Sequence, residues 1–166
     1  MKYYIDVKDL KKFYYNLSIN DQVFLTGKVY TARDAAHRRL EKLNLNDEEL
    51  PINIKDSVIY YTGPTPAKPG MVIGSCGPTS SYRMNKYLEP LLKLGLVGII
   101  GKGDINKEAK NLIKKYRAIY FTAIGGAGAL ACKYVKSMKE IAFLDLRCES
   151  IKEFYIENFP LFISQI

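Results

Sequence analysis

The segment GSCGPTSSYRMN, residues 74–85, places hydroxyl and basic side chains directly after a Gly-Pro turn. Arg83 follows Thr79 by one helical turn, so in a helix that begins near Thr79 both side chains could reach one ligand. The first turn of a helix has free backbone N–H groups and the positive end of the helix dipole, which together favour an anion. Thr79 could instead serve only as the helix N-cap, a position where Ser and Thr are preferred. Three consecutive hydroxyl residues exceed what one cap requires, so we expect an anion site in this segment.

Two further segments place a basic residue where a strand would give way to a helix. In TARDAAH, residues 31–37, Arg33 stands at the start of an apparent helix, although an ion pair with Asp34 or Glu41 would explain it alone. In the GKG segment, Lys102 lies between glycines that let the backbone approach a ligand closely. Arginine binds carboxylates through two hydrogen bonds and lysine acts as a point charge, so the three loops together predict a site for a small dicarboxylate.

Short apolar runs alternate with amphipathic stretches along the chain. The expected strands cover residues 2–7, 23–25, 57–61, 71–73, 97–100, 118–122 and 141–146. The expected helices cover residues 32–43, 82–94, 106–116 and 127–135. Strands separated by helices pair in parallel, and ligands bind at the carboxyl ends of such strands. We therefore predict one layered α/β domain over residues 1–166, with a largely parallel central sheet and extra strands from the N-terminal third packed beside it.

Charge and hydropathy limit the class of protein. The net charge is +8, but the 25 Lys and Arg residues are spread along the chain and form no nucleic-acid-binding motif, so no nucleic-acid partner is expected. A positive potential also draws small anions toward the protein. No apolar run approaches the roughly 20 residues of a membrane-spanning helix, and the start MKYYIDVKDL lacks the pattern of a secretory signal. We expect a cytoplasmic protein without membrane association.

The cysteines do not suggest a self-contained metal site. Cys76, Cys132 and Cys148 lie far apart and form no C-x-x-C pair, which argues against a disulfide framework and against a zinc or iron–sulfur site within this chain. His37 could complete a three-cysteine site only if the fold gathered all four residues. Buried thiols are the commoner reason for such cysteines, and reduced thiols fit the cytoplasm. We expect this chain to bind no metal.

A competing motif lies in GGAGALA, residues 125–131. Gly126, Gly128 and Ala131 match the G-x-G-x-x-A pattern of dinucleotide-binding loops, and Asp145 follows at about the distance of a ribose-binding acid. Only one further strand and a tail follow the motif, too little for a complete dinucleotide-binding fold. Close packing of a helix on a strand explains the small residues equally well. A nucleotide-binding module is therefore the alternative from a different functional class.

Six ordered segments together resemble the β subunit, or C-terminal domain, of class I fumarases and L-tartrate dehydratases. They are GKVYTARDAAHRRL (27–40), YYTGPTPAKPG (60–70), GPTSSYRM (77–84), IIGKGD (99–104), IGGAGAL (124–130) and ENFPLFI (157–163). The resemblance spans nearly the whole chain and implies a swivelling β/β/α domain. It also implies a separate α subunit whose cysteines hold a four-iron, four-sulfur (4Fe-4S) cluster, so that this chain would contain half of an active site. The family further suggests an α2β2 heterotetramer.

The resemblance implies a role for individual residues. Arg33 and Arg83 look like carboxylate-binding arginines, and Lys102 and Ser80 look like further substrate contacts. Thr79 matches the family threonine at the substrate carbon and is a candidate catalytic residue for proton transfer. A threonine hydroxyl is a poor base unless a neighbouring cation such as Arg83 or Lys102 lowers the cost of ionising it. The implied reaction is reversible addition of water across a carbon double bond, in which the partner's cluster activates the hydroxyl group and a protein base handles the carbon-bound proton.

Two positions depart from the family pattern. Asn85 stands where Asp is frequent after R-M, and Ser80 stands where a second Thr is common. Both differences bear on which hydroxy acid is preferred. Fumarate and malate are expected over tartrate, because nothing in the sequence contradicts the commoner substrate. The expected function is the β subunit of a fumarate hydratase, a hydro-lyase active only with its α subunit, and an L(+)-tartrate dehydratase β subunit is the alternative within the same family.

Overall fold

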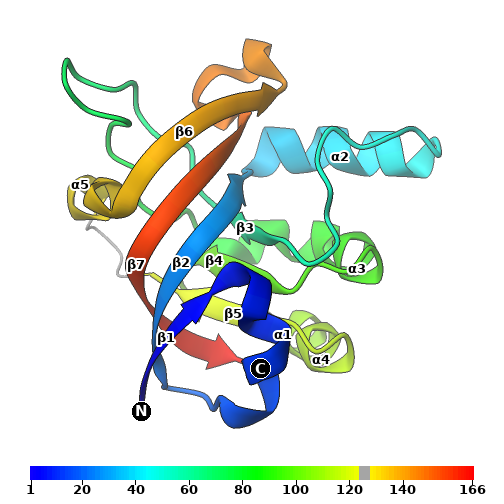
Figure 1. Ribbon diagram of the computed structural model, residues 1–166. Helices are drawn as coiled ribbons and strands as arrows, with labels where there is room; N and C mark the ends of the chain where they lie inside the picture. Colours follow the sequence, from blue (N-terminus) through cyan, green and yellow to red (C-terminus); the bar gives the residue numbers. More distant parts are fainter. Residues whose placement is uncertain (124–127) are drawn as a thin grey trace.

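The computed structural model describes residues 1–123 and 128–166 and has a mixed α/β fold (Figure 1). Among these residues, seven strands form one sheet in the order β1-β2-β3-β4-β5-β7-β6, and β2 also pairs with β7. The strands are β1 (Lys2–Asp6), β2 (Gln22–Thr31), β3 (Val58–Tyr60), β4 (Gly98–Gly101), β5 (Ile119–Thr122), β6 (Val135–Ala142) and β7 (Ile151–Gln165).

Neighbouring strands from β1 to β5 are parallel. Val58 of β3 pairs with Gly98 of β4, which in turn pairs with Ile119 of β5. β1 and β3 both lie along the same edge of β2, because β7 occupies its other edge. The parallel pairing expected from strand–helix alternation is thus present in these five strands.

An antiparallel strand closes the sheet on itself. β7 pairs with β2 in a register that joins Val23 to Leu161, and its last residues pair with β5. Strands β2, β3, β4, β5 and β7 therefore form a ring, and β1 and β6 extend it. The sheet is thus a partly closed one of mixed direction, and the layered, largely parallel sheet that we expected is not confirmed, because the fifteen-residue β7 runs against both of its ring neighbours.

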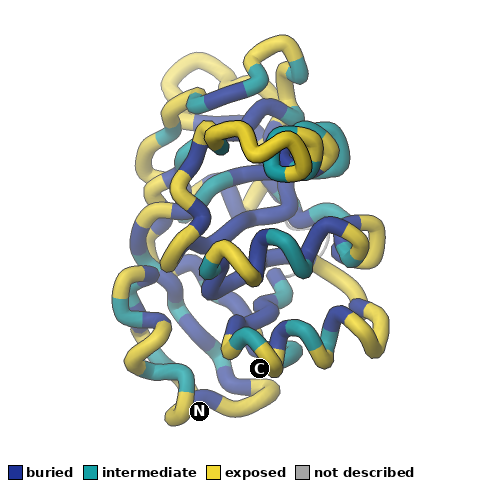
Figure 2. The backbone as a smooth tube through the Cα atoms, turned by 90° about the vertical axis from the view of Figure 1, so that its right-hand side faces the viewer, coloured by how far each residue is buried: buried dark blue, intermediate teal, exposed yellow. Residues whose placement is uncertain are grey.

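Three helices cover one side of the ring (Figure 1). The helices of the structure are α1 (Leu10–Phe13), α2 (Asp34–Leu45), α3 (Asn85–Lys93), α4 (Lys107–Lys115) and α5 (Gly128–Ala131), with short 3₁₀ turns between some elements. In the view of Figure 2, α2, α3 and α4 lie one above another in front of the sheet, and each carries both buried and exposed residues. None of the helices in the described ranges has the length and apolar character needed to cross a bilayer.

Alternate residues of the strands pack in two different hydrophobic cores. Val58 and Tyr60 belong to the core that fills the ring, and Ile59 and Tyr61 belong to the core between the ring and the helices. The strand period of two thus explains why β3 reads as an uninterrupted apolar run: both of its faces are buried.

Three expected elements of the sequence differ in the structure. Residues 71–73 are not a strand but part of a long loop in which Met71 and Val72 are exposed. The expected strand at 141–146 ends at Ala142, because Phe143 has a positive φ of 58° and a 3₁₀ segment follows. The expected helix at 127–135 is described only from Gly128, and it ends at Ala131 before a 3₁₀ turn and β6.

Candidate active site

The expected site residues lie beyond the carboxyl ends of neighbouring strands. Arg33 follows β2, Lys102 follows β4, and Thr79 belongs to the loop between β3 and α3. A hydrogen bond of 2.7 Å from the Thr79 N–H to the Tyr61 carbonyl holds this loop against the end of β3. Because β2, β3 and β4 are adjacent and parallel, the three segments meet at one edge of the sheet.

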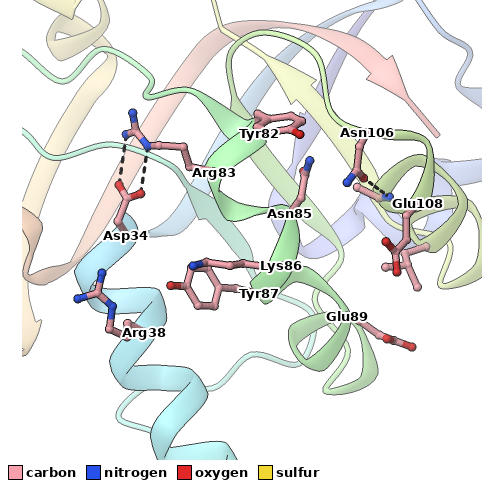
Figure 3. Close-up of a pocket in the computed structure, with 12 residues that line it drawn as sticks. Asp34, Arg38, Tyr82, Arg83, Asn85, Lys86, Tyr87, Glu89, Asn106 and Glu108 are labelled. Atoms are coloured by element: carbon pink, nitrogen blue, oxygen red, sulfur yellow. Dashed lines mark hydrogen bonds and ion pairs between the residues drawn. The ribbon is translucent and has the colours of Figure 1, made fainter.

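Arg83 connects Thr79 to Asp34. Its Nη2 donates to Thr79 Oγ at 2.8 Å and to Asp34 Oδ2 at 3.2 Å, and its Nε donates to Asp34 Oδ1 at 3.0 Å. Figure 3 shows the two parallel contacts between the guanidinium and the carboxylate, which come from the start of α2 and the turn before α3. A hydroxyl that accepts a hydrogen bond from a cation is easier to ionise, so the arrangement favours proton transfer at Thr79.

The Asp34 carboxylate is held in its charged form. Its partial burial acts to raise the pKa, but the hydrogen bonds from Arg83, a backbone hydrogen bond and the charge of Arg33 outweigh burial, so the pKa lies below the ordinary value. Asp34 is therefore a permanent anion between two arginines at neutral pH.

Arg33 is the second arginine near Asp34. Its Nε is 4.0 Å from Asp34 Oδ2 and 4.0 Å from Glu149 Oε1, and this buried Nε has no hydrogen-bond partner among the described residues. Gly63 makes room for the side chain, because a Cβ at that position would lie 2.8 Å from Arg33 Cδ. The Arg33 side chain is 30% exposed, and a positioned guanidinium that solvent can reach suits the binding of a carboxylate.

Lys102 and Ser80 are placed by a backbone contact. The two residues form an isolated parallel bridge, and the Ser81 N–H donates to the Lys102 carbonyl at 3.1 Å. The buried ring of Tyr120 fixes the same loop, since its hydroxyl lies 2.9 Å from Ser81 Oγ and donates to the Gly103 carbonyl at 2.8 Å. The Lys102 side chain is exposed at this edge. The loop therefore presents an ammonium group on a rigid base.

A pocket of about 570 Å³ opens beside the Arg83–Asp34 pair (Figure 3). Its walls come from α2, α3 and the start of α4, and the charged residues that line it are Asp34, Arg38, Arg83, Lys86, Glu89 and Glu108. Arg83 and Asp34 thus separate this pocket from Thr79, which does not line it. Arg83 thus contacts the Thr79 hydroxyl and also lines a pocket that is large enough for a small anion.

The helix start differs from the expected one. The first helical turn begins at Ser81, α3 begins at Asn85, and Ser80 stands at the N-cap without a capping hydrogen bond from its side chain. The N–H groups of Thr79 and Ser81 donate to carbonyls at the ends of β3 and β4 and are not free for an anion. Thr79 is neither the N-cap nor part of an anion-binding helix end, and its hydroxyl contacts Arg83 instead.

His37 belongs to the packing beneath the site. It is 1% exposed, its Nδ1 lies 2.8 Å from the Arg33 carbonyl, and its ring packs against the rings of Tyr61 and Tyr87. Burial lowers the pKa of His37 to about 4 against the opposing effects of the hydrogen bond and of Asp34. Because the carbonyl can only accept, Nδ1 carries the proton and the neutral ring holds the backbone at Arg33.

The cysteines do not gather into a ligand set in the part of the chain that the structure describes. Within residues 1–123 and 128–166, no three His, Cys, Asp or Glu side chains gather to hold a metal ion. Cys76 and Cys132 are buried in the ring core, whereas Cys148 is exposed. The described residues therefore do not fit a four-iron, four-sulfur cluster, which needs four thiolates or equivalent ligands around it.

The nucleotide alternative gains no support from the structure. Gly126 lies outside the described residues, and Gly128 packs so closely that a Cβ there would lie 2.9 Å from the Gly77 nitrogen. Asp145, the expected ribose ligand, is paired with Arg39 through a hydrogen bond of 2.7 Å. Close packing explains the small residue at Gly128.

Four residues of the site were not assigned by sequence reasoning. Asp34 was considered only as a partner of Arg33, whereas it binds Arg83, which is 49 positions away. Gly63 and Tyr120 shape the loops through contacts between distant segments, and Glu149 reaches Arg33 from the segment before β7. The adjacent Arg-Asp pair in TARD was the one available signal, because a carboxylate between converging cations reduces their repulsion.

Comparisons with known proteins find a matching family model and several relatives. A family model described as Fumarase C-terminus matches residues 2–165. A protein of Methanocaldococcus jannaschii with the provisional name L(+)-tartrate dehydratase subunit beta is 38% identical over 163 residues, which cover 95% of this chain and 82% of that protein. The aerobic class I fumarate hydratase of Escherichia coli K12 is 35% identical over 147 residues, which cover 87% of this chain but 27% of that protein. Fumarate hydratase 2 of Leishmania major is likewise 35% identical over 147 residues, 87% of this chain and 26% of that protein.

Proposed function

Because this chain belongs to the fumarase C-terminus family, we propose that it is the β subunit of an iron–sulfur-dependent hydro-lyase that interconverts fumarate and L-malate. The relatives named as fumarate hydratases and as a tartrate dehydratase β subunit support a hydro-lyase subunit. The chain spans about a quarter of the fumarate hydratases, so the remaining part of the active site would come from a partner α subunit.

The contact that supports this proposal most directly is the hydrogen bond from Arg83 to Thr79 at the meeting point of three loops. In the proposed reaction, Arg33 and Arg83 bind the two carboxylates of the substrate, and Lys102 with Ser80 adds further contacts. Thr79 Oγ, in its ionised form, takes the carbon-bound proton when water is lost and becomes a neutral hydroxyl, which returns the proton when water is added. The neighbouring guanidinium of Arg83 stabilises the negative charge of ionised Thr79 before the proton is taken.

The family resemblance implies a 4Fe-4S cluster, for which the described residues of this chain offer no ligand set. We therefore assign the cluster to the α subunit, in a proposed α2β2 assembly, and limit the role of this chain to binding carboxylates and moving the proton. The swivelling β/β/α arrangement of the family would let this domain meet its partner at the carboxyl ends of β2, β3 and β4.

L-tartrate is the second candidate substrate. The Methanocaldococcus jannaschii relative, which is named for tartrate dehydration, matches over most of its own length. Ser80 and Asn85 stand at the two positions where this chain departs from the family pattern, and both lie close to Thr79 and Arg83 in the sequence. A shorter hydroxyl side chain at Ser80 would leave more room for the second hydroxyl group of tartrate.

An anaerobic pull-down from native lysate with this chain as bait tests the proposal. We expect a co-eluting iron–sulfur protein, a mass consistent with two copies of each subunit, and hydration of fumarate by the eluate. Turnover of L-tartrate without turnover of fumarate would show that L-tartrate is the substrate. An iron-free and inactive eluate from folded bait would contradict the proposed function. Arg83→Ala in the complex should abolish turnover, and unchanged turnover would remove Arg83 from the site.

A further inference from the structure

We propose that Asp34 is a positioning residue of the hydro-lyase site, which orients the Arg83 guanidinium toward both Thr79 and a substrate carboxylate. This inference rests on the proposed function for its catalytic part, whereas the orientation of Arg83 can be tested independently. Asp34 lies outside the set of residues that the family resemblance assigns.

The hydrogen bonds around Arg83 determine which of its donors remain for a ligand. A guanidinium has five N–H donors in one plane. Asp34 accepts from Nε and Nη2 at 3.0 and 3.2 Å, and Thr79 accepts from Nη2 at 2.8 Å. Nη1 forms no hydrogen bond with any residue in the described part of the chain. Its two N–H groups thus point away from Asp34 and are available to a carboxylate.

The bidentate contact fixes the plane of the guanidinium as well as its position. A single hydrogen bond would allow rotation about the contact, whereas two parallel bonds to one carboxylate do not. Rotation would break the bond to Thr79, because the same nitrogen, Nη2, serves both Asp34 and Thr79. The carboxylate is therefore needed to keep the cation next to the hydroxyl.

Asp34 is itself held firmly. It is the first residue of the twelve-residue α2, where an anion is stabilised by the helix dipole. Arg33 Nε also lies 4.0 Å from Asp34 Oδ2, the oxygen that accepts from Arg83 Nη2. One anion between Arg33 and Arg83 lowers the repulsion between two cations that must approach the same small substrate.

Asp34 is poorly suited to be the proton acceptor. Both of its oxygens accept hydrogen bonds from Arg83, and these bonds help to hold the pKa of the carboxyl below its ordinary value, which makes the carboxylate a weak base. Its effect on the reaction is therefore exerted through Arg83.

The test compares Asp34→Asn and Asp34→Glu in the complex with the α subunit. Asp145→Asn is the matched control, because Asp145 also binds an arginine of α2, Arg39, through two hydrogen bonds but lies outside the site. We expect Asp34→Asn to lower kcat and raise KM, with a combined loss in kcat/KM of about 10- to 100-fold. Asp34→Glu should recover part of this loss, and the control should stay within about twofold of the wild type.

Three kinetic results would overturn the inference. Unchanged kcat and KM per active site in Asp34→Asn would show a structural role at most. An equal loss in the Asp145→Asn control would show a general effect of ion pairs on α2. Disappearance of the acidic limb of the pH profile of kcat/KM in Asp34→Asn would identify Asp34 itself as the base.

A measurement on the full chain alone separates this inference from the proposed function. In ¹⁵N NMR, the Arg83 Nε–H, assigned by its absence in Arg83→Lys, should be protected from exchange in the wild type and in Asp145→Asn. It should lose protection in Asp34→Asn. A wild-type complex without hydratase activity would contradict the proposed function, whereas an unprotected Arg83 Nε–H in the wild type would contradict the orientation by Asp34.

Discussion

Acidification should destabilise this protein through His37, and the structure gives the size of the effect. The ring is almost completely buried, and its pKa of about 4 lies well below the value of 6.5 for an exposed histidine. Burial is the main cause, because the charged ring would lose its water and contact the aromatic rings of Tyr61 and Tyr87 instead. Asp34 is the charged group that opposes this effect.

The sign follows from proton binding. As the pH falls below about 6.5, the unfolded chain binds a proton at His37 before the folded chain does, so the unfolded state is favoured. Above pH 6.5 His37 is neutral in both states and costs no stability. Between pH 6.5 and about pH 4 the free energy of unfolding falls progressively. A difference of this size corresponds to about 3 kcal/mol for one group. That is a large share of the 5–15 kcal/mol of a typical domain, by order of magnitude.

Urea denaturation of the wild type and of His37→Phe between pH 7.5 and about pH 4 measures this loss. Phenylalanine keeps the ring and cannot titrate, and the Arg33 carbonyl keeps a hydrogen bond of 2.9 Å from the backbone N–H of residue 37. We expect the free energy of unfolding to fall steeply in the wild type and much less in the variant. Parallel pH profiles for the two proteins would refute the assignment to His37.

Three further predictions concern the loops and the core. Gly63→Ala should raise KM at least severalfold with the fold retained, because the new Cβ would lie 2.8 Å from Arg33 Cδ, and steady-state kinetics of the complex would check this. Tyr120→Phe removes two hydrogen bonds and should lower the free energy of unfolding by about 1–3 kcal/mol in urea titrations. An unchanged urea midpoint would contradict a stabilising role of the contacts from Tyr120 to Ser81 and Gly103. Among the three cysteines, only Cys148 should react quickly with a thiol reagent in the folded protein, since burial raises the pKa of Cys76 to about 12, and rapid labelling that persists in Cys148→Ser would contradict this packing.

Local patterns predicted several elements because those elements contain their own signals. The apolar spacing at 106–116 indicated α4, and Asn106 caps this helix through a hydrogen bond from the Ala109 N–H. The short apolar runs at 57–61, 97–100 and 118–122 are β3, β4 and β5, which are buried on both faces and therefore contain few polar residues.

Most of β6 and all of β7 were not predicted, because their sequences do not show the pattern of a strand in a buried sheet. Half of the residues of β6, VKSMKEIA, are exposed, and β7 mixes Lys152, Glu153, Glu157 and Asn158 with its apolar residues. Their pairing with each other and with the ring depends on contacts far apart in the chain, which no local window contains.

The candidate site was also predicted only where local sequence contained the signal. The residue types at the three strand ends predicted an anion site, and the structure brings Thr79 and Arg83 into direct contact. The role of Asp34 could not be predicted, since its neighbour in sequence is Arg33 and its hydrogen-bond partner is Arg83. The order of the strands places the start of α2 beside the turn before α3, and Asp34 therefore forms its hydrogen bonds with Arg83 and not with Arg33.

The position of β7 also has a consequence for folding during synthesis. The ring closes only when residues 151–165 pair with β2 and β5, so a ribosome must produce most of the chain before one edge of β2 is covered. Until then the nascent chain exposes unpaired N–H and C=O groups of a ten-residue strand, a template for pairing with other chains. Contacts of such long sequence separation also slow folding. A chaperone that holds the nascent chain until β7 emerges should therefore raise the yield of soluble protein more than a lower temperature alone.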